Sequence, residues 1–192
     1  DIIENLVKES IKIKIPILTF YTFSTENWKR PRKEISFLFK LIEDYFNKEI
    51  NNLVKNGVKI NIFGNLNALP KKIKKCLIKS MLVTKNCKKI IVNLAINYGS
   101  KYEILNAYKQ LKRKKSKVSF KNFERNLYTE GMPEPDLLIR TGGEKRLSNF
   151  LLWQLAYSEL YFIKKLWPDF KVSDYHKIIK NFRKVKRNFG DI

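Results

Sequence analysis

The sequence predicts an α/β fold, a single domain with a mostly parallel central sheet flanked by helices. Continuous apolar runs of strand length alternate along the chain with longer segments of helical periodicity. Strands that lack polar alternation are typical of a parallel sheet covered on both faces. A length of 192 residues suits one such domain, and no linker or internal repeat divides it. Residues 1–192 are therefore expected to form one unit.

The first half of the chain contains three predicted strands and two helices. The strands are the apolar runs 16–24, 58–64 and 88–99. The first helix begins near Pro31 and stops at Gly57, because proline suits a first turn and glycine suits the residue after a helix. Its apolar stripe at helical spacing consists of Ile35, Leu38, Phe39, Ile42, Tyr45, Phe46 and Leu53. A basic amphipathic helix over 70–86 follows.

The second half continues the alternation with shorter elements. The final helix is expected to be capped by Ser173, a residue type whose hydroxyl accepts from backbone amides of a first turn. A run of basic residues at 112–117 is expected to be a solvated turn. The predicted elements are helices over 101–115, 120–128, 151–157 and 173–189, a strand over 136–142 and a short buried strand over 159–163.

The composition narrows the possible partners. The chain has 40 Lys and Arg against 18 Asp and Glu, a net charge of +22, which predicts attraction to nucleic acid, anionic lipid or phosphorylated small molecules. The lysines are scattered, so a solvated surface explains this charge equally well. No apolar run could span a bilayer, and the charged N-terminal segment lacks the centre of a secretory signal. Cys76 and Cys87 have no metal-binding spacing and are expected to be free thiols of a reducing compartment.

Polar segments follow three of the predicted strands. FSTENWKRP follows the first strand, NYGS follows the strand over 88–99, and RTGGEKRLSN follows the strand over 136–142. Ligands of open parallel sheets bind beyond the carboxyl ends of the strands. These three segments are therefore the expected walls of a ligand site.

The segment RTGGEKRLSN has the residues of a diphosphate clamp. Arg140 and Arg146 offer planar forks that match phosphate oxygens, and Ser148 adds a hydroxyl. Gly142 and Gly143 would let the backbone approach a ligand, with their successive amides forming an anion nest. A Gly-Gly turn with two surface arginines remains the alternative.

The segment after the first strand and the aromatic residues beyond it allow two interpretations each. Ser24, Asn27 and Arg30 are polar groups beside Trp28, and Glu26 could be a helix-start carboxylate; a capped loop with a packing tryptophan is the plainer interpretation. The apolar residues after Pro31 are denser than one buried face requires, so part of them could line a hydrophobic tunnel. Core packing is the alternative for this set, which is Phe37, Leu38, Phe39, Leu41, Tyr45 and Phe46.

Glu159 lies inside the apolar run AYSELYFI, where an unpaired carboxylate would be unfavourable. It is therefore expected to have a partner. An arginine of the fold and a magnesium ion held against a diphosphate are equally consistent with this position.

At this point the chain resembles the cis-prenyltransferase family of undecaprenyl diphosphate and dehydrodolichyl diphosphate synthases. The resemblance rests on LTFYTFSTENWKRP at 18–31, on DLLIRTGGEKRLSNFLLWQLAYSELYF at 136–162 and on LWPDF at 166–170, with support from NYGSKYEI at 97–104. It covers essentially the whole chain. It implies condensation of isopentenyl diphosphate with an allylic prenyl diphosphate such as farnesyl diphosphate, giving long cis-polyprenyl diphosphates for dolichol or undecaprenol carriers. The implied fold is a parallel sheet with a hydrophobic tunnel at the carboxyl ends of the strands, usually in a homodimer.

The resemblance also implies roles for residues. Arg140, Arg146 and Ser148, with Leu147 between them, would bind the diphosphate of isopentenyl diphosphate, and Glu159 would be a Mg²⁺ ligand at the dimer interface. Asn27 would orient the reacting groups, because a neutral amide is a very weak base and a phosphate oxygen is the better proton acceptor. The wall near the reacting carbons would consist of Ser24, Thr25, Glu26, Asn27, Trp28 and Arg30.

One departure from the family pattern leads to further expectations. The family begins with a strand and a phosphate loop of the form MDGNGRWA, which contains an essential Asp, and this segment does not occur here. The domain is therefore expected to be N-terminally incomplete, with its first strand and phosphate loop absent and the chain alone inactive. A non-catalytic accessory subunit is the alternative. A nucleic-acid-binding domain is not expected, because it leaves Glu159 and the aromatic stripes unexplained. The expected location is the cytoplasm or the surface of the endoplasmic reticulum, or a plastid if a targeting segment lies upstream, with peripheral membrane contact.

Overall fold

The computed structural model describes residues 2–188 and shows an α/β fold of alternating helices and strands. The helices are α1 (Ile2–Lys12), α2 (Arg32–Lys55), α3 (Lys71–Thr84), α4 (Ser100–Arg113), α5 (Phe120–Glu124) and α6 (Val172–Phe182). The strands are β1 (Ile17–Ser24), β2 (Val58–Phe63), β3 (Ile90–Tyr98), β4 (Leu137–Arg140) and β5 (Glu159–Phe162). Three short 3₁₀ helices complete it: η1 (Thr25–Lys29), η2 (Leu66–Ala68) and η3 (Trp167–Asp169).

The strands pair in parallel, as predicted, but in the described residues they form two sheets. A three-stranded sheet has the order β1-β3-β2, and a two-stranded sheet pairs β4 with β5. The central strand β3 is buried along most of its length, which explains why it reads as a continuous apolar run. One polar side chain interrupts that run: Asn93 is 1% exposed and donates to Thr19 Oγ1 at 3.0 Å, while it accepts from Asn61 Nδ2 at 3.2 Å. These three residues are in register, so a polar ladder crosses the whole sheet.

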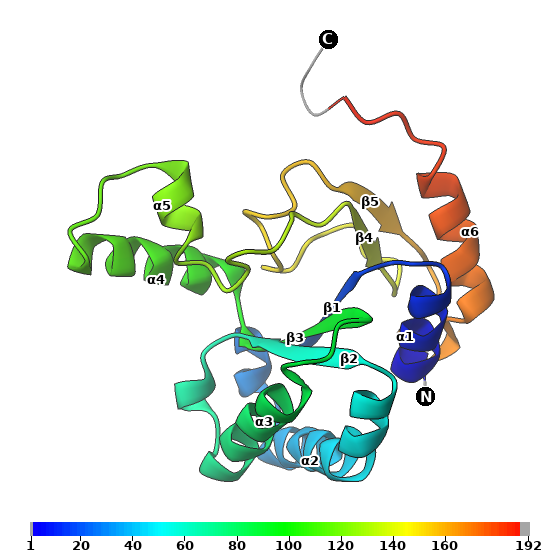
Figure 1. Cartoon of the computed structure of the whole chain (residues 1–192), viewed down its shortest axis with the longest axis horizontal. Coiled ribbons are helices and arrows are strands. Elements are labelled where there is room, and N and C mark those ends of the chain that lie inside the picture. The colour runs from blue at the N-terminus through cyan, green and yellow to red at the C-terminus, as the bar shows by residue number, and fades with distance from the viewer. Residues whose placement is uncertain (1, 189–192) are drawn as a thin grey trace.

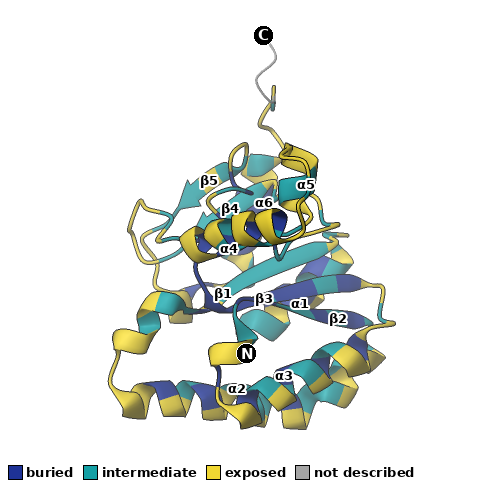
Figure 2. Ribbon diagram, turned by 90° about the vertical axis from the view of Figure 1, so that its left-hand side faces the viewer, coloured by how far each residue is buried: buried dark blue, intermediate teal, exposed yellow. Residues whose placement is uncertain are grey.

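The elements form layers around the two sheets (Figure 1). Helices α2 and α3 cover one face of the three-stranded sheet. Helices α1 and α6 contact each other and lie side by side. The main apolar core fills the layer between the sheet and α2 and α3, where buried residues face each other (Figure 2). Helices α4 and α5 project from the body on the side opposite α6 (Figure 1).

The predicted helix over 151–157 is wrong, because this segment is a series of turns. Its apolar spacing is helical, but Leu151 at its first position has a left-handed backbone angle (φ 43°), as do Ser148 (φ 49°) and Asn149 (φ 64°) just before it. A right-handed helix cannot begin through such angles. Leu151 and Leu155 are buried in the core from turns instead, whereas Leu152 and Tyr157 are 36% and 56% exposed.

Several predicted boundaries also change. The final helix begins after Lys171, not after Ser173, and Asp174 Oδ2 accepts from the Lys171 amide at 3.0 Å. The carboxylate thus takes the capping role predicted for a hydroxyl. The helix ends at Phe182, so the predicted helix is wrong over 183–188, which form a turn and irregular structure; residue 189 lies outside the described residues. Helix α5 ends at Glu124, short of the predicted residue 128, and β5 is half-exposed, with Leu160 43% accessible.

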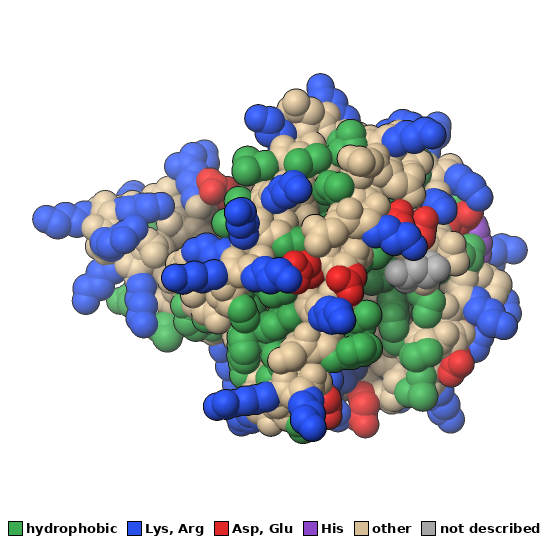
Figure 3. All heavy atoms as spheres, turned by 90° about the horizontal axis from the view of Figure 1, so that it is seen from below, with side chains coloured by type: hydrophobic (Ala, Val, Ile, Leu, Met, Phe, Trp, Pro, Cys, Tyr) green, Lys and Arg blue, Asp and Glu red, His purple; other side chains and the backbone are tan. Residues whose placement is uncertain are grey.

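The basic side chains are spread over the surface. On the face formed by α2 and α3, lysines and arginines surround hydrophobic and acidic side chains and do not gather in one block (Figure 3). Within residues 2–188, no helix has both the length and the apolar character needed to cross a membrane.

Candidate functional site

The three polar segments that follow β1, β3 and β4 meet in space. Asn149 Nδ2 donates to Glu26 Oε1 at 2.8 Å, which joins the segment after β4 to the segment after β1. The Asn149 carbonyl accepts from the Ser100 amide at 2.8 Å, which adds the segment after β3. The expectation that these segments meet is therefore confirmed, and their role as walls of a ligand site stays a prediction.

The segment after β1 is the 3₁₀ helix η1, held by its own side chains. Asn27 Oδ1 accepts from the Ser24 amide at 2.8 Å, and Thr25 Oγ1 donates to Glu26 Oε2 at 3.0 Å. The Asn27 oxygen is thus fixed as a cap. Trp28 stacks edge-on to Phe23 and donates from Nε1 to Asn97 Oδ1 at 2.8 Å. Both the plainer interpretation, a capped loop with a packing tryptophan, and the proximity to a ligand site are therefore compatible with η1.

The residues of the predicted diphosphate clamp lie partly together. Arg140 Nη1 donates to the Arg146 carbonyl and to Ser148 Oγ, the latter at 2.8 Å, so this guanidinium is half-buried and bound to the turn. The Arg146 side chain is 63% exposed and pairs with Glu144. Leu147 packs against the core cluster beneath. Arg140 and Ser148 are preorganised as a pair, whereas Arg146 must leave Glu144 before it can bind an anion.

The predicted anion nest of Gly142 and Gly143 is wrong. Both residues have the positive φ angles of a glycine turn, 92° and 80°. Their amides, however, donate to the carbonyls of Lys165 at 2.7 Å and Ile163 at 2.8 Å. The turn is fastened to the segment after β5, and these two N–H groups are not available to an anion.

The electrostatics of η1 favour an ionised Glu26. Burial alone would raise its pKa, but hydrogen bonds from Asn149, from its own backbone and from Thr25 outweigh burial, and the pKa of Glu26 is lowered. Burial, reinforced by the Glu26 charge, raises the pKa of Tyr21 to about 12. The site therefore contains a fixed negative charge beside a neutral phenol.

Glu103, which the sequence analysis did not single out, is a buried carboxylate that connects the segments around the candidate site. Glu103 is 1% exposed and accepts from Tyr98 Oη at 2.5 Å, from the Tyr128 amide at 2.8 Å and from Gln154 Nε2 at 3.2 Å. It connects α4 to the end of β3 and to the two loops on either side of β4. An acid four residues into a helix gives no sequence signal for this role, because acids are favoured in first turns generally.

Glu159 has no arginine partner within the described residues. It starts β5, its amide donates to the Asp136 carbonyl at 3.0 Å, and its half-buried side chain makes no ion pair or hydrogen bond with residues 2–188. In the same part of the chain no three acidic, histidine or cysteine side chains gather as a metal site would require. The expected arginine partner is therefore absent there, and the magnesium role stays a prediction.

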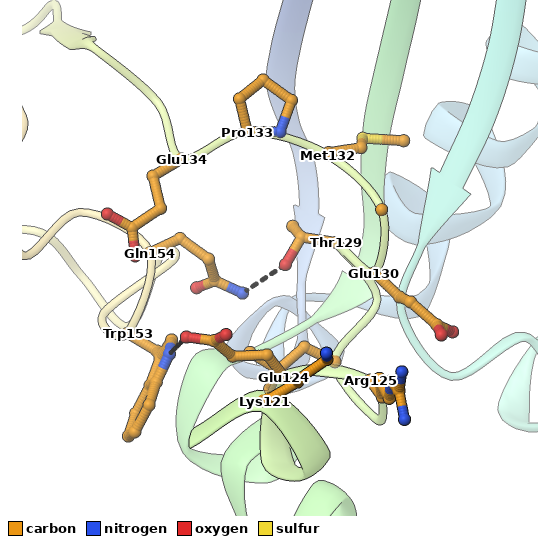
Figure 4. Close-up of a pocket in the computed structure, with 12 residues that line it drawn as sticks. Lys121, Glu124, Arg125, Thr129, Glu130, Met132, Pro133, Glu134, Trp153 and Gln154 are labelled. Atoms are coloured by element: carbon orange, nitrogen blue, oxygen red, sulfur yellow. Dashed lines mark hydrogen bonds between the residues drawn. The ribbon is translucent and has the colours of Figure 1, made fainter. Parts of the chain in front are cut away.

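Two cavities among the described residues lie away from the clamp. The larger, about 400 Å³, lies between α5 and the loops around Thr129 and Gln154 (Figure 4). Gln154 donates to Thr129 Oγ1 at 3.1 Å, while its own carbonyl oxygen is buried without a partner. The smaller, about 230 Å³, lies between α1 and the start of α6.

The predicted hydrophobic tunnel stays a prediction, because the two cavities described above do not lie behind Arg140 and Arg146. The space between the sheet and α2 is filled by side chains, among which Phe23, Trp28 and Phe39 pack with ring centroids 5.1–5.7 Å apart. Of the apolar set after Pro31, Phe39 and Phe46 are buried in the core and Leu38 and Tyr45 pack against it, whereas Phe37 and Leu41 are exposed.

Comparison with known proteins identifies the family. The family model described as "Putative undecaprenyl diphosphate synthase" matches residues 1–190. The chain belongs to this family of prenyltransferases. It is 42% identical to an isoprenyl transferase of Oceanobacillus iheyensis, covering 99% of this chain and 78% of that protein, and 46% identical to one of Rickettsia typhi, covering 99% and 84%.

Solved structures of prenyl diphosphate synthases have the same fold. The crystal structure of a probable undecaprenyl diphosphate synthase from Campylobacter jejuni matches with a TM-score of 0.90 and 38% identity, covering 98% of this chain and 90% of that one. Lavandulyl diphosphate synthase from Lavandula x intermedia, in complex with dimethylallyl diphosphate, matches with a TM-score of 0.92 and 29% identity, covering 98% and 84%.

These coverages do not support the expectation that a first strand and phosphate loop are missing. The prediction that the chain alone is inactive rested on that expectation and stays untested. Nothing in the comparisons favours an accessory subunit over an enzyme.

Proposed function

We propose that this protein condenses isopentenyl diphosphate with an allylic prenyl diphosphate and repeats the step to give a cis-polyprenyl diphosphate. The observation that carries the proposal is the meeting of η1, the start of α4 and the Arg140–Ser148 pair at the ends of three strands. The names of the relatives favour an undecaprenol-type product, and a dolichol-type product gains no support from them. One structural relative is described in complex with an allylic diphosphate.

In this proposal the diphosphate of isopentenyl diphosphate binds the segment after β4. Arg140 and Ser148 already lie within hydrogen-bond distance of each other, so one bound phosphate can accept from both. Arg146 completes the clamp when it exchanges Glu144 for the ligand, and Leu147 keeps the turn in place through its core contacts. Guanidinium groups bind diphosphate through two parallel N–H donors, which fixes the orientation of the substrate.

The reacting carbons would then lie against η1. The allylic C–O bond breaks, its diphosphate leaves, the homoallylic double bond forms the new C–C bond, and a proton passes to a diphosphate oxygen. Asn27 is suited to orienting and not to proton abstraction, because its oxygen is already bound to the Ser24 amide. The wall of this part of the site consists of Ser24, Thr25, Glu26, Asn27, Trp28 and Arg30.

Magnesium is the cofactor that this chemistry requires, and Glu159 is its proposed ligand in this chain. The described residues fit only the binding mode in which Mg²⁺ takes one or two carboxylates and completes its shell with phosphate oxygens and water. When bound, the ion supplies positive charge that stabilises the leaving diphosphate.

A homodimer is proposed because, among the described strands, β5 pairs only with β4 and exposes an apolar side chain. Leu160 in β5 is 43% exposed, and Tyr157, which lies just before the strand, is 56% exposed. Covering the edge of β5 in a dimer would remove a strand edge from solvent and bring Glu159 to the interface. Sedimentation velocity tests this: a monomer at micromolar concentration would contradict it. The hydrophobic product also favours peripheral membrane contact, which flotation with vesicles tests.

Titration calorimetry with isopentenyl diphosphate tests the clamp. Arg140→Ala removes a charged donor, so affinity should fall roughly 10- to 100-fold, from about 1.5–3 kcal/mol per charged hydrogen bond. Arg125→Ala, an exposed arginine at the end of α5, is the matched control and should bind like the unchanged protein. Equal affinity in all three proteins would rule out the clamp.

A further inference from the structure

One residue that none of the sequence motifs singled out, Asn149, touches all three segments of the proposed site. Its Nδ2 donates to Glu26 Oε1 in η1, and its Oδ1 accepts from the Lys101 amide in the first turn of α4, both at 2.8 Å. Its backbone carbonyl accepts from the Ser100 amide, also at 2.8 Å. It directly follows Ser148, the hydroxyl of the proposed clamp.

The orientation of the Asn149 amide is fixed by chemistry at both ends. A carboxylate can only accept, so the NH₂ group must face Glu26, and a backbone N–H can only donate, so the carbonyl must face Lys101. A flipped amide would set oxygen against oxygen and N–H against N–H. Both side-chain groups are therefore committed, and each contact supports the other.

The surroundings leave the amide no room to move. A Cβ added at Gly99 would lie 2.7 Å from Asn149 Nδ2 and 2.6 Å from Thr25 Oγ1, closer than packed atoms approach. Asn149 also has φ 64°, a left-handed backbone that asparagine tolerates better than most residues. Glycine at position 99 and asparagine at position 149 thus allow η1, the start of α4 and the turn after β4 to come this close.

We propose that Asn149 is a positioning residue that makes the diphosphate turn and the η1 wall respond as one unit. This rests on the proposed function, since it assumes that an anion binds the Arg140–Ser148 turn. An anion that fixes the turn also fixes Asn149. Asn149 donates to the ionised Glu26, and Glu26 accepts from Thr25 within η1. Occupation of one side of the site therefore orders the other side.

Hydrogen exchange of the whole chain with and without inorganic pyrophosphate tests the proposal. In the unchanged protein, pyrophosphate should slow exchange in the peptide that covers 136–150 and also in the peptide that covers 20–32. In Asn149→Ala the first protection should persist and the second should be lost. Exchange in the second peptide should also be about 10- to 100-fold faster without ligand, as expected for the loss of a hydrogen bond to a charged group worth about 1.5–3 kcal/mol.

Asn126→Ala is the matched control. Asn126 is also half-buried and uses both ends of its amide, donating to the Asn122 carbonyl and accepting from Lys114 Nζ, both at 2.8 Å, but it lies beyond α5. A loss of stability without loss of coupling is the result expected for it. Protection of both peptides in Asn149→Ala would show that another contact carries the coupling.

Other results separate this inference from the proposed function. Protection of 136–150 alone in the unchanged protein would leave the clamp standing and overturn the coupling. Protection of neither peptide would overturn the clamp and the coupling with it.

Exchanging the hydrogen-bond donor and acceptor between positions 26 and 149 gives a second, independent test. Asn149→Asp keeps the acceptor for the Lys101 amide, so the start of α4 stays bound, but it places a second carboxylate against Glu26. Coupling should be lost although the melting temperature changes little. Adding Glu26→Gln restores one donor and one acceptor with their positions exchanged, and the protection of 20–32 should return. Failure of the double variant to regain it, with its melting temperature unchanged, would overturn the pairwise role.

Discussion

Replacing Glu103 should destabilise the protein more than any change to a surface acid, because its carboxylate satisfies three buried donors. In Glu103→Ala the Tyr98 hydroxyl and the Tyr128 amide lose their acceptor, whereas Gln154 Nε2 keeps Thr129 Oγ1. Each orphaned buried donor costs about 1–3 kcal/mol, so the loss is about 2–6 kcal/mol. For a chain of this size, about 4 kcal/mol lowers the melting temperature by roughly 8–16 °C.

Glu103→Gln separates the hydrogen bonds from the shape. Its remaining oxygen can accept from the Tyr128 amide, and its NH₂ can donate to a reversed Tyr98 hydroxyl, but it also faces the NH₂ of Gln154. The expected loss is therefore smaller, about 1–3 kcal/mol. Urea unfolding followed by circular dichroism measures both. Glu130→Ala, an exposed acid in the next loop, should stay within about 0.5 kcal/mol of the unchanged protein.

The order of the Glu103 variants by loss of unfolding free energy tests this prediction. If Glu103→Ala loses less than about 1 kcal/mol, the three contacts do not carry the stability assigned to them. If Glu103→Gln is worse than Glu103→Ala, the opposed NH₂ groups at positions 103 and 154 cost more than the hydrogen bonds that glutamine keeps, which contradicts the expected ranking.

Two further predictions concern the close approach at Gly99 and the cap of α6. Gly99→Ala should weaken pyrophosphate binding measured by calorimetry, because its Cβ would lie within 2.7 Å of both Thr25 and Asn149 and must push η1 away; unchanged binding would show that the segments adapt freely. A hydrogen bond from Lys165, and then one from the Lys171 amide, lower the pKa of Asp174 below its ordinary 3.8, so its contribution to stability is present above that pH and is lost as the pH falls through the lowered value. Asp174→Asn should therefore be less stable than the unchanged protein in urea at about pH 6, with a gap that narrows toward pH 3; a gap independent of pH would contradict the assignment.

The strands and long helices could be predicted because their signals are local. The run IIVNLAINY at 90–98 is apolar on both faces, and β3 is the buried central strand of its sheet. The segment LLWQLAY has equally good helical spacing and is not a helix. Left-handed angles at Ser148, Asn149 and Leu151 exclude it, and they arise from contacts with α4 and η1 that the segment itself does not reveal.

The candidate site could be predicted as three segments but not as a set of contacts. The rule that ligands bind at strand ends placed η1, the start of α4 and the turn after β4 together. The bond between Glu26 and Asn149 joins residues 123 positions apart, and nothing in either segment marks the partner. The amides of Gly142 and Gly143 show the same limit. Their acceptors are carbonyls of the segment after β5, so amides that were expected to bind an anion bind the backbone instead.

The aromatic packing between the sheet and α2 has the largest consequence for the proposed chain elongation. Phe23 and Phe39 are 1% and 5% exposed, and Trp28 closes the ring cluster from η1, so a prenyl chain that entered between the sheet and α2 at this point would have to displace these rings. Apolar density in a sequence predicts a dry interior, but the same side chains can meet or leave a channel after shifts of an ångström or two. Since Trp28 belongs to η1, and η1 is bound to the diphosphate turn through Asn149, moving this wall is the simplest way to open such a channel. Diphosphate binding and channel opening would then share one structural element, and a protein in which η1 cannot move should bind substrate without elongating it.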